Sequence, residues 1–197
     1  MPVRVKHSRT PHLPWTGSAT SDDRLLAEAD VSRLFAGHPV TMSEKMDGEC
    51  TTIYADGYCH ARSLDSGPHE SRTWVRRLAG EIAHRIPAGW RLCGENLYAR
   101  HSIPYDALPS YFLCFSIYDE RDVCLAWSDT RDFAADIGVE TVPSTKAPST
   151  RRGSARCGTG SRAAGPPEAR VTWCVWRIPS TSIASASRSP STCAPVT

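Results

Sequence analysis

The chain has 197 residues and carries 23 Lys and Arg against 21 Asp and Glu, a formal net charge of +2. This length suits one domain, or one domain with a tail. No apolar run approaches the roughly 20 residues that cross a bilayer, and the basic residues 1–7 precede no apolar core of a secretory signal. We therefore expect a cytoplasmic protein without a membrane partner; no pattern specifies its oligomeric state.

The charge is distributed unevenly along the chain. Up to Pro143 the net charge is roughly −5, and after it roughly +7. The eight cysteines form no C-x-x-C pair, and no histidine cluster has zinc spacing. Several cysteines fall within strand-like runs, where a reduced thiol behaves as a small hydrophobic residue. We expect free thiols, and the metal ligands are left unassigned.

The first expected elements are an extended lead-in and a helix. Residues 7–21 are rich in Pro, Ser, Thr and His, which favour extended chain. Asp22 and Asp23 then open a helix that Gly37 closes, since acidic side chains stabilise the positive N-terminal end of a helix.

Three strand-like runs follow, separated by two Asp-Gly pairs: residues 39–42, residues 51–54 and a run ending at residue 61, with Asp47-Gly48 and Asp56-Gly57 between them. Asp-Gly between alternating runs predicts a tight hairpin, because both central residues of the favoured turn need positive φ. Lys45 would then lie at a strand end, with Arg62 brought back beside it. A lysine is a nucleophile only when its amine is neutral, which a neighbouring cation favours. Taken alone, a surface lysine before an ordinary turn is the commoner interpretation.

The next segment predicts an amphipathic helix over residues 71–86. Large apolar side chains recur there at every fourth position: Trp74, Leu78, Ile82 and Ile86. Trp74 is expected in the core rather than as a stacking platform for bases. The opposite face is basic and is expected to be solvated rather than bound to phosphates: Arg72, Arg76, Arg77 and Arg85.

Further strands are expected over residues 90–93, running into 94–98, and over residues 111–118, 124–127 and 139–143. Gly94-Glu95 is expected to form a tight turn. Before the last strand, Ser128 would cap a helix that Gly138 ends. Strands, hairpins and inserted helices together predict an α+β domain with antiparallel sheets.

Four motifs now stand in a fixed order: Lys45–Gly48 (KMDG), Arg62, Gly94–Tyr98 (GENLY) and Phe115–Asp119 (FSIYD). In this order they resemble the covalent nucleotidyltransferases, which are the ATP-dependent polynucleotide ligases and the mRNA capping enzymes. They are most similar to the RNA ligases of the phage RNA ligase 2 type and their bacterial relatives, as are residues 9–14 (RTPHLP) and 95–111. The resemblance covers roughly residues 9–143 and implies a nucleotidyltransferase fold.

The resemblance implies an enzyme that uses ATP and Mg2+ to adenylate its own lysine and to seal a 5′-phosphate to a 3′-hydroxyl at RNA ends, as in RNA repair. By this resemblance, Lys45 would attack the α-phosphate and hold AMP, and Glu44 would meet the adenine edge. Asp47 and Gly48 would shape the turn that presents the lysine.

The remaining motifs supply the other implied contacts. Arg62 would contact the phosphate or the end of the nucleic acid, and Glu95 would hold the ribose or orient a metal-bound water. Phe115 would stack on adenine, with Tyr118 as the alternative; outside this context Phe115 would be a core residue. These roles agree with the chemistry, because triphosphate attack builds negative charge that cations and Mg2+ stabilise.

Two features depart from the resemblance. Cys50 stands where close relatives have asparagine, and a thiol cannot replace an amide that bonds in two directions. In addition, the Glu-Gly strand that binds the metal and the strand whose lysines grip the α-phosphate are missing. Residues 144–197 are mostly Ser, Arg, Ala, Thr, Pro and Gly, with Glu168 as the one acid. We expect residues 1–143 to form a partial nucleotidyltransferase domain and residues 144–197 to be a disordered tail.

The genetic code suggests an origin for this tail. Read from the third base of each codon, Thr172–Pro179 can encode Val-Val-Arg-Leu-Ala-Asp-Ser, with Glu-Gly-Tyr allowed just before it. Ser189–Val196 can likewise encode Ala-Lys-Tyr-Val-Arg. Because these strings resemble the two missing motifs, our hypothesis is that the coding frame slips near Pro143. The C-terminal part of the fold would then be incomplete and adenylation impaired.

Two alternatives stay open. The chain could be an inactive truncated remnant, or a nucleic-acid-binding fragment that uses the basic helix face and the basic tail. It could also be a sister enzyme, a DNA ligase or a GTP-using capping enzyme, against which residues 95–111 argue.

Overall fold

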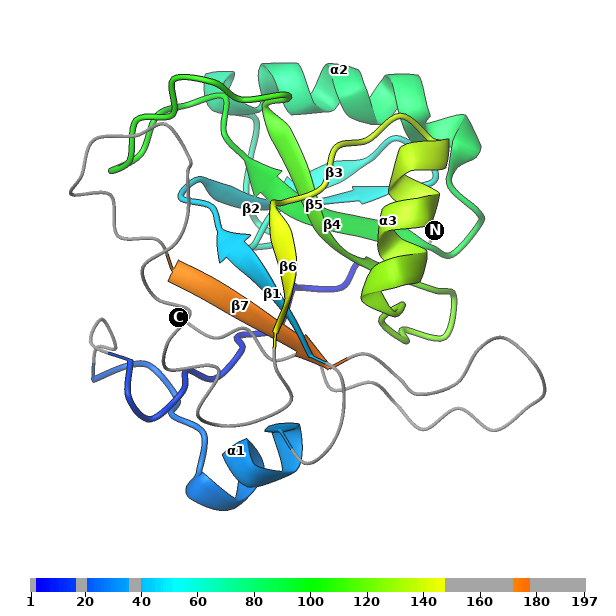
Figure 1. The fold of residues 1–197 in the computed structure, drawn as a ribbon. Coiled ribbons are helices and arrows are strands. Elements are labelled where there is room, and N and C mark those ends of the chain that lie inside the picture. The colour runs from blue at the N-terminus through cyan, green and yellow to red at the C-terminus, as the bar shows by residue number, and fades with distance from the viewer. Residues whose placement is uncertain (1–2, 17–20, 36–39, 148–171, 178–197) are drawn as a thin grey trace. The chain divides into compact units, whose positions relative to one another are not determined.

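The computed structural model of the protein describes residues 3–16, 21–35, 40–147 and 172–177. The chain divides into two compact units. The core unit comprises the described residues 3–8 and 46–142, and the flanking unit comprises residues 9–16, 21–35, 40–45, 143–147 and 172–177. Figure 1 labels the elements of both units.

The core unit is built on a four-stranded antiparallel sheet in the order β3-β2-β4-β5. Its strands are β2 (Glu49–Tyr54), β3 (Cys59–Ala61), β4 (Arg91–Asn96) and β5 (Phe112–Tyr118). They confirm the strands predicted over residues 51–54, 90–93 and 111–118, whereas the tight turn predicted at Gly94-Glu95 is wrong because both residues lie within β4. Asp56-Gly57 joins β2 to β3 with Gly57 at a φ of 77°, so the second predicted hairpin is also confirmed.

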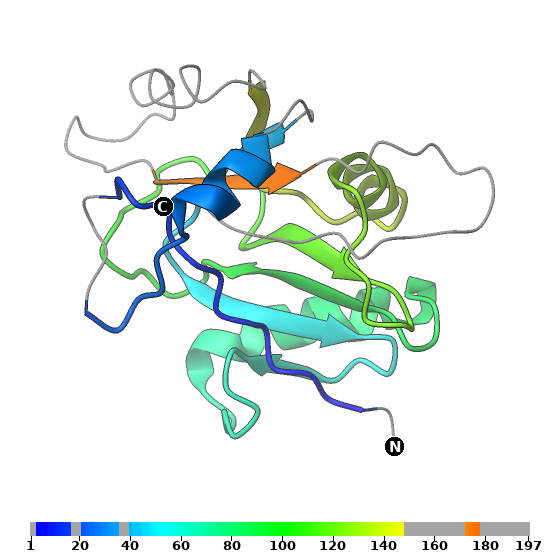
Figure 2. The same cartoon turned by 90° about the horizontal axis from the view of Figure 1, so that it is seen from below.

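Helix α2 (Thr73–Ile82) lies along one face of this sheet (Figures 1 and 2). The 3-10 turns η1 (Glu70–Arg72) and η2 (Ala83–Arg85) flank it, which confirms the helix predicted over residues 71–86. Its buried face packs with Ile53 of β2 in one apolar cluster. Because side chains alternate along a strand, Tyr54 points to the opposite face of the sheet.

The region after β5 differs from the prediction. Helix α3 spans Trp127–Asp136 with Ala126 as its N-cap residue, so the predicted cap at Ser128 is wrong. Trp127 is buried in an apolar cluster, which favours its inclusion in the helix. The strand predicted over residues 124–127 is only a bridge between Cys124 and Tyr118, and the strand predicted over 139–143 is a parallel bridge of Thr141 to Cys114.

Helix α1 of the flanking unit spans Glu28–Phe35 and begins later than Asp22 and Asp23 predicted. The residues before it pair with the lead-in instead. The His12 N–H donates to the Arg24 carbonyl at 2.6 Å, and the Leu26 N–H donates to the His12 carbonyl at 2.7 Å. Backbone groups paired in this way cannot also close helical turns, which explains the late start.

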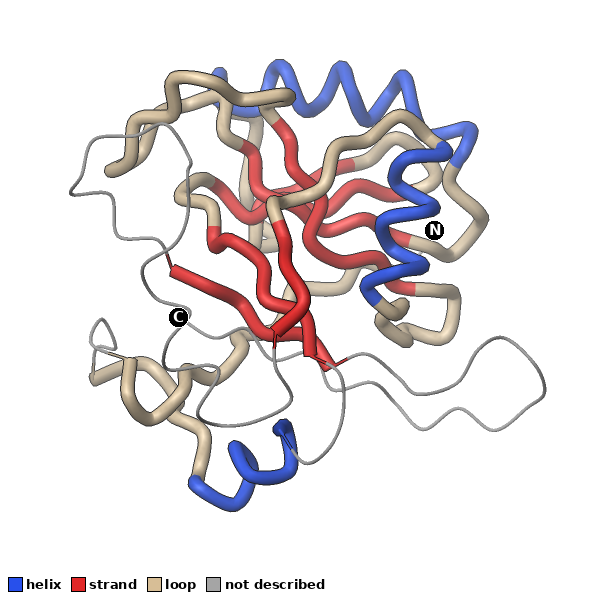
Figure 3. The backbone as a smooth tube through the Cα atoms, viewed as in Figure 1, coloured by secondary structure: helices blue, strands red, loops and turns tan. Residues whose placement is uncertain are grey.

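The flanking unit has its own antiparallel sheet in the order β6-β1-β7, with the strands in red in Figure 3. The central strand is β1 (Val40–Lys45), and its partners are β6 (Ser144–Ala147) and β7 (Thr172–Arg177). Both partners come from the segment expected to be disordered, and each covers one backbone edge of β1, which would otherwise be unpaired. Residues 148–171 and 178–197 of that segment lie outside the described residues.

The hairpin predicted at Asp47-Gly48 is wrong. β1 and β2 belong to different sheets, and Gly48 lacks the positive φ that a tight hairpin turn requires. The Asp47-Gly48 pair instead carries the chain from one sheet into the other. Within the described residues, no helix is long and apolar enough to cross a membrane.

Candidate active site

Lys45 is the last residue of β1, as predicted for a strand end, and its side chain is exposed. Because side chains alternate along a strand, Lys45 shares one face of β1 with Ser43, and Glu44 shares the other face with Met42. Glu44 is buried, and this burial raises the pKa of its carboxyl group. Lys45 and Glu44 belong to the flanking unit, whereas the other predicted site residues belong to the core unit.

Asp47 connects the motif segment, residues 45–48, to the loop between β4 and β5. Its Oδ2 accepts the N–H groups of Ser102 at 2.8 Å and Ile103 at 2.9 Å. Its own N–H donates to the Tyr105 hydroxyl at 2.7 Å. Asp47 therefore shapes the backbone here by ordering a loop that lies far away in sequence.

Gly48 is required for close approach rather than for its φ. Its N–H donates to Glu95 Oε1 at 3.1 Å. A Cβ atom at this position would lie 2.5 Å from the carbonyl oxygen of Asn96 and 2.8 Å from Leu97 Cδ2. Only a residue without a side chain therefore lets the motif backbone contact the end of β4.

Glu95 and Arg62 both act on Cys50. In the register of β2 and β4, Cys50 lies opposite Glu95. Burial raises the pKa of the Cys50 thiol, the charge of Glu95 adds to this, and Arg62 acts in the opposite direction. The thiol is therefore neutral. The core unit thus brings Gly48 into hydrogen-bond contact with Glu95, opposite Cys50, and the charge of Arg62 acts on the Cys50 thiol.

Phe115 lies beside a residue that the sequence did not indicate. The His7 ring packs edge-on with Phe115, with 5.3 Å between ring centroids, and lies 6.2 Å from the ring of Tyr118. Burial, followed by the charges of Arg62 and Arg91, lowers the pKa of His7 from its usual 6.5 to about 4. Phe115 also packs against an apolar cluster of the core unit, so its ring has a structural role as well.

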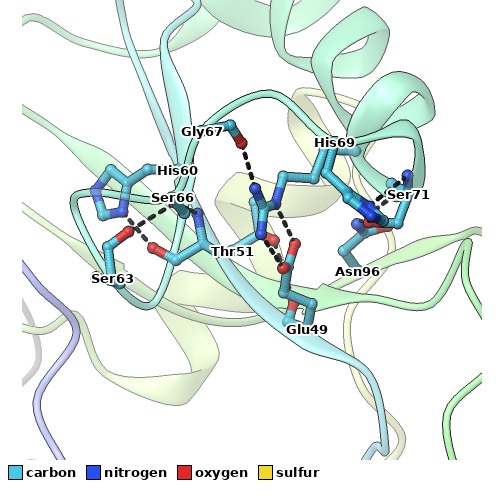
Figure 4. A network of polar contacts seen from close by, with 11 residues as sticks. Glu49, Thr51, His60, Ser63, Ser66, Gly67, His69, Ser71 and Asn96 are labelled. Carbon is cyan, nitrogen blue, oxygen red and sulfur yellow. Dashed lines mark hydrogen bonds and ion pairs between the residues drawn. The ribbon is translucent and has the colours of Figure 1, made fainter.

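A polar network lies around Glu49 at the start of β2 (Figure 4), and it includes Arg72, for which the sequence predicted a solvated position. Arg72 Nε donates to Glu49 Oε1 at 2.7 Å, and Arg72 Nη2 donates to Glu49 Oε2 at 2.5 Å. A further guanidinium N–H donates to the Gly67 carbonyl. The prediction of a solvated basic face is therefore wrong for Arg72, whereas Arg76 and Arg77 are exposed as expected.

No group of three or more His, Cys, Asp or Glu side chains that could hold a metal ion occurs in the part of the chain that the structure describes. Mg2+ is commonly bound through one or two carboxylates, together with waters and substrate phosphates.

A sequence model of a family described as RNA ligase matches residues 38–168. Among curated proteins, no match was found. A Naegleria gruberi RNA ligase solved with PPi is similar with a TM-score of 0.52 and 16% identity, covering 77% of this chain and 50% of that chain. A mutant of the Naegleria gruberi RNA ligase with AMP and Mn has a TM-score of 0.52 and 14% identity, covering 76% of this chain and 50% of that chain. An archaeal ATP-dependent RNA ligase has a TM-score of 0.45 and 21% identity, covering 64% of this chain and 37% of that chain.

The chain thus spans half or less of the length of these solved structures. At these identities the two Naegleria gruberi structures show a shared fold. The prediction of an α+β nucleotidyltransferase fold with antiparallel sheets is confirmed.

Proposed function

The chain belongs to the RNA ligase family, and on this premise we propose that it is a cytoplasmic, ATP-dependent RNA ligase that adenylates Lys45 and seals 5′-phosphate to 3′-hydroxyl RNA ends. The observation that carries this proposal is the family match over residues 38–168, because that range contains all four motifs.

In the proposed first step, the neutral amine of Lys45 attacks the α-phosphorus of ATP. A P–N bond forms, the bond from the α-phosphorus to the bridging oxygen breaks, pyrophosphate leaves, and the amine loses a proton. The RNA 5′-phosphate then attacks the phosphorus of the lysine-bound AMP, which breaks the P–N bond and frees Lys45. The 3′-hydroxyl of the other RNA end attacks the activated 5′-phosphate, and AMP leaves. The exposed position of Lys45 at the end of a strand supports this role, because its amine is accessible to a nucleotide.

The adenosine is proposed to contact Glu44 and Phe115. The carboxyl group of Glu44, whose pKa burial raises, would accept a hydrogen bond from the amino group at the adenine edge. Phe115 would stack on the base, with Tyr118 as the alternative. The partial exposure of both rings supports this assignment.

Arg62 is proposed to contact the phosphate or the end of the nucleic acid, and Glu95 the ribose or a metal-bound water. Arg62 contributes the positive charge that a phosphate requires. Mg2+, when bound, would supply further charge neutralisation, and Glu95 would hold the ribose or orient a metal-bound water. Gly48 and Asp47 would hold the motif segment in place, a role that the 3.1 Å contact from Gly48 to Glu95 supports.

The adenylation activity of this chain is proposed to be impaired. Residues 1–143 would form a partial nucleotidyltransferase domain, and residues 144–197 would be an off-frame tail, into which the family match extends as far as residue 168. Each missing phosphate-binding lysine would remove a charge-assisted contact of about 2–3 kcal/mol, or about 100-fold in rate.

Incubation with α-labelled ATP and Mg2+ tests the proposal. We expect at most slow labelling, which is abolished in Lys45→Ala and unchanged in Lys6→Ala. Label that persists in Lys45→Ala would overturn the assignment of the nucleophile, and fast labelling of this chain would overturn the impairment. Sequencing of the gene across residues 140–197 tests the proposed frame slip. If the alternative reading frame does not encode the two motif strings, the frame slip is ruled out.

A second candidate function is binding of nucleic acid without catalysis. The exposed Arg76 and Arg77 on α2 favour it, because arginines on one helix face can contact phosphates. Salt-dependent RNA binding that weakens in Arg76→Ala, without any labelling at Lys45, would support this alternative.

A further inference from the structure

An N-terminal strap, residues Arg4–His7, lies along the sheet of the core unit (Figure 2). Tyr54 of β2 fixes its backbone. The Val5 N–H donates to the Tyr54 hydroxyl at 2.9 Å, and this hydroxyl donates to the Val5 carbonyl at 3.3 Å. Since Ile53 packs towards α2, the strap contacts the opposite face of the sheet.

Arg4 anchors the strap in a cage of aromatic side chains. Its guanidinium lies 4.5 Å from the centre of the Tyr54 ring and 4.2 Å from the centre of the Tyr58 ring. It also forms a two-pronged ion pair with Asp56, with N–O distances of 3.1 and 2.5 Å. A bidentate ion pair combined with two cation–π contacts restricts a side chain more than a single surface ion pair does.

His7 lies three residues beyond this anchor, against the aromatic side chains of β5. Its ring centroid is 5.3 Å from that of Phe115 and 6.2 Å from that of Tyr118. His7, Phe115 and Tyr118 are each only partly buried, so a ligand could reach this cluster.

We propose that His7 is a wall of the nucleotide site that contacts the base stacked on Phe115, and that Arg4 is the positioning residue that holds His7 there. This inference rests on the proposed nucleotide-binding function, and it adds a specificity-determining residue from outside the four motifs.

The chemistry of His7 suits this role. Burial and the charges of Arg62 and Arg91 lower the pKa of His7 to about 4, so the imidazole is neutral near pH 7. A neutral imidazole has one donor and one acceptor nitrogen and can therefore pair with the edge of a base. Phe115 offers stacking but no hydrogen bond. Arg91 is paired with Asp122, whereas the charge of Arg62 near His7 favours an anionic ligand such as a nucleoside triphosphate.

Equilibrium binding of two probes to the full chain tests the proposal. ATP carries the base, whereas inorganic tripolyphosphate carries only the phosphates. We expect His7→Ala to weaken ATP binding about tenfold and to leave tripolyphosphate binding unchanged, because only the base contact is removed. Arg4→Ala should also weaken ATP binding, and Arg4→Lys should recover part of the loss, since lysine keeps the charge. Lys6→Ala, in the same strap but with an exposed side chain, is the matched control and should change neither affinity.

A second readout does not depend on nucleotide. In NMR titrations, His7 should have a pKa of about 4 in the wild-type chain and a value near 6.5 in Arg4→Ala, because the released strap would return the imidazole to solvent.

Three outcomes would overturn the proposal. If the wild-type chain binds ATP and His7→Ala binds it equally well or more tightly, His7 is not a wall of the site. If His7→Ala weakens ATP and tripolyphosphate equally, its contact is not with the base. If the wild-type chain does not bind ATP at all, the proposed function fails and this inference fails with it.

Discussion

Replacement of Gly48 by alanine tests whether the motif segment contacts β4 as the structure shows. The added Cβ would lie 2.5 Å from the backbone oxygen of Asn96 and 2.8 Å from Leu97 Cδ2. Leu97 can rotate away, but a backbone carbonyl within a sheet cannot. The motif backbone must therefore move, and the 3.1 Å hydrogen bond from the Gly48 N–H to Glu95 would be lost.

The expected loss in the free energy of unfolding follows from the clash and from the lost hydrogen bond. Overpacking of this kind costs about 1–3 kcal/mol, and a hydrogen bond to a charged group contributes about 1.5–3 kcal/mol. Because one backbone shift relieves the clash and breaks the bond together, we expect a total of about 2–4 kcal/mol. For a chain of this length, that corresponds to a fall in Tm of about 5–15 °C.

Gly80→Ala provides a matched control. Gly80 lies inside α2, and a Cβ there would meet no atom within 4 Å. Alanine stabilises an exposed helix position by about 0.5–1 kcal/mol relative to glycine, so this variant should melt slightly higher than the wild type. Thermal melts followed by circular dichroism measure both changes. If Gly48→Ala were as stable as the wild type while Gly80→Ala behaved as expected, the contact between the motif segment and β4 would be refuted.

Three further predictions concern stability and thiol reactivity. As pH falls from about 6.5 to about 4, His7 takes up a proton in the unfolded chain but not in the folded chain, so the free energy of unfolding should fall by at most about 3 kcal/mol. The stabilising contribution of His7 is fully present above pH 6.5. Urea melts of His7→Gln should not show this fall. Arg72→Lys should lower the free energy of unfolding by about 2 kcal/mol, because lysine cannot form both bonds to the Glu49 carboxylate. Arg77→Ala removes only an exposed ion pair and should change the free energy of unfolding by less than about 0.5 kcal/mol. Equal effects of the two substitutions would contradict the network in Figure 4. Burial raises the pKa of the Cys93 thiol to about 11 and also raises the pKa of the Cys114 thiol. Iodoacetamide at pH 8 should therefore modify both cysteines only after unfolding. Rapid modification of these cysteines in the folded chain would contradict their burial.

Local sequence patterns predicted the elements of the core unit well, because each depends on residues close together in the chain. The four-residue spacing from Trp74 to Ile86 indicated α2 and its flanking turns. The aromatic run over residues 111–118 indicated β5. In both cases the apolar pattern coincides with the side of the element that packs into the core.

The two Asp-Gly pairs show where such patterns stop being sufficient. Asp56-Gly57 forms a hairpin with a positive φ at Gly57, whereas Asp47-Gly48 joins strands of different sheets. The flanking runs look alike, and the difference arises from the pairing partners of β1, which come from residues 144–147 and 172–177. A short local signal contains no information about such distant partners.

The candidate site was predictable only where it coincides with motifs. The resemblance to known ligases selected Lys45 and Glu95 as candidate site residues, and their roles stay predictions. The contacts of His7 with Phe115 and of Asp47 with Ser102 join residues far apart in the chain, and no periodicity connects them. The pair of Arg72 with Glu49 was hidden for the same reason, since helix periodicity placed Arg72 only on a polar face.

Transfer of AMP to Lys45 tests the proposed function most directly. The measurement is the rate of labelling with α-labelled ATP, followed by peptide mapping of the modified residue, in this chain and in a chain whose residues 144–197 are replaced by the alternative reading frame. We predict that the frame-restored chain is labelled at Lys45 about 100-fold faster or more, and that Lys45→Ala abolishes the label in both chains. The proposed function would be contradicted by label on another residue, by label that persists in Lys45→Ala, or by a frame-restored chain that takes up no AMP.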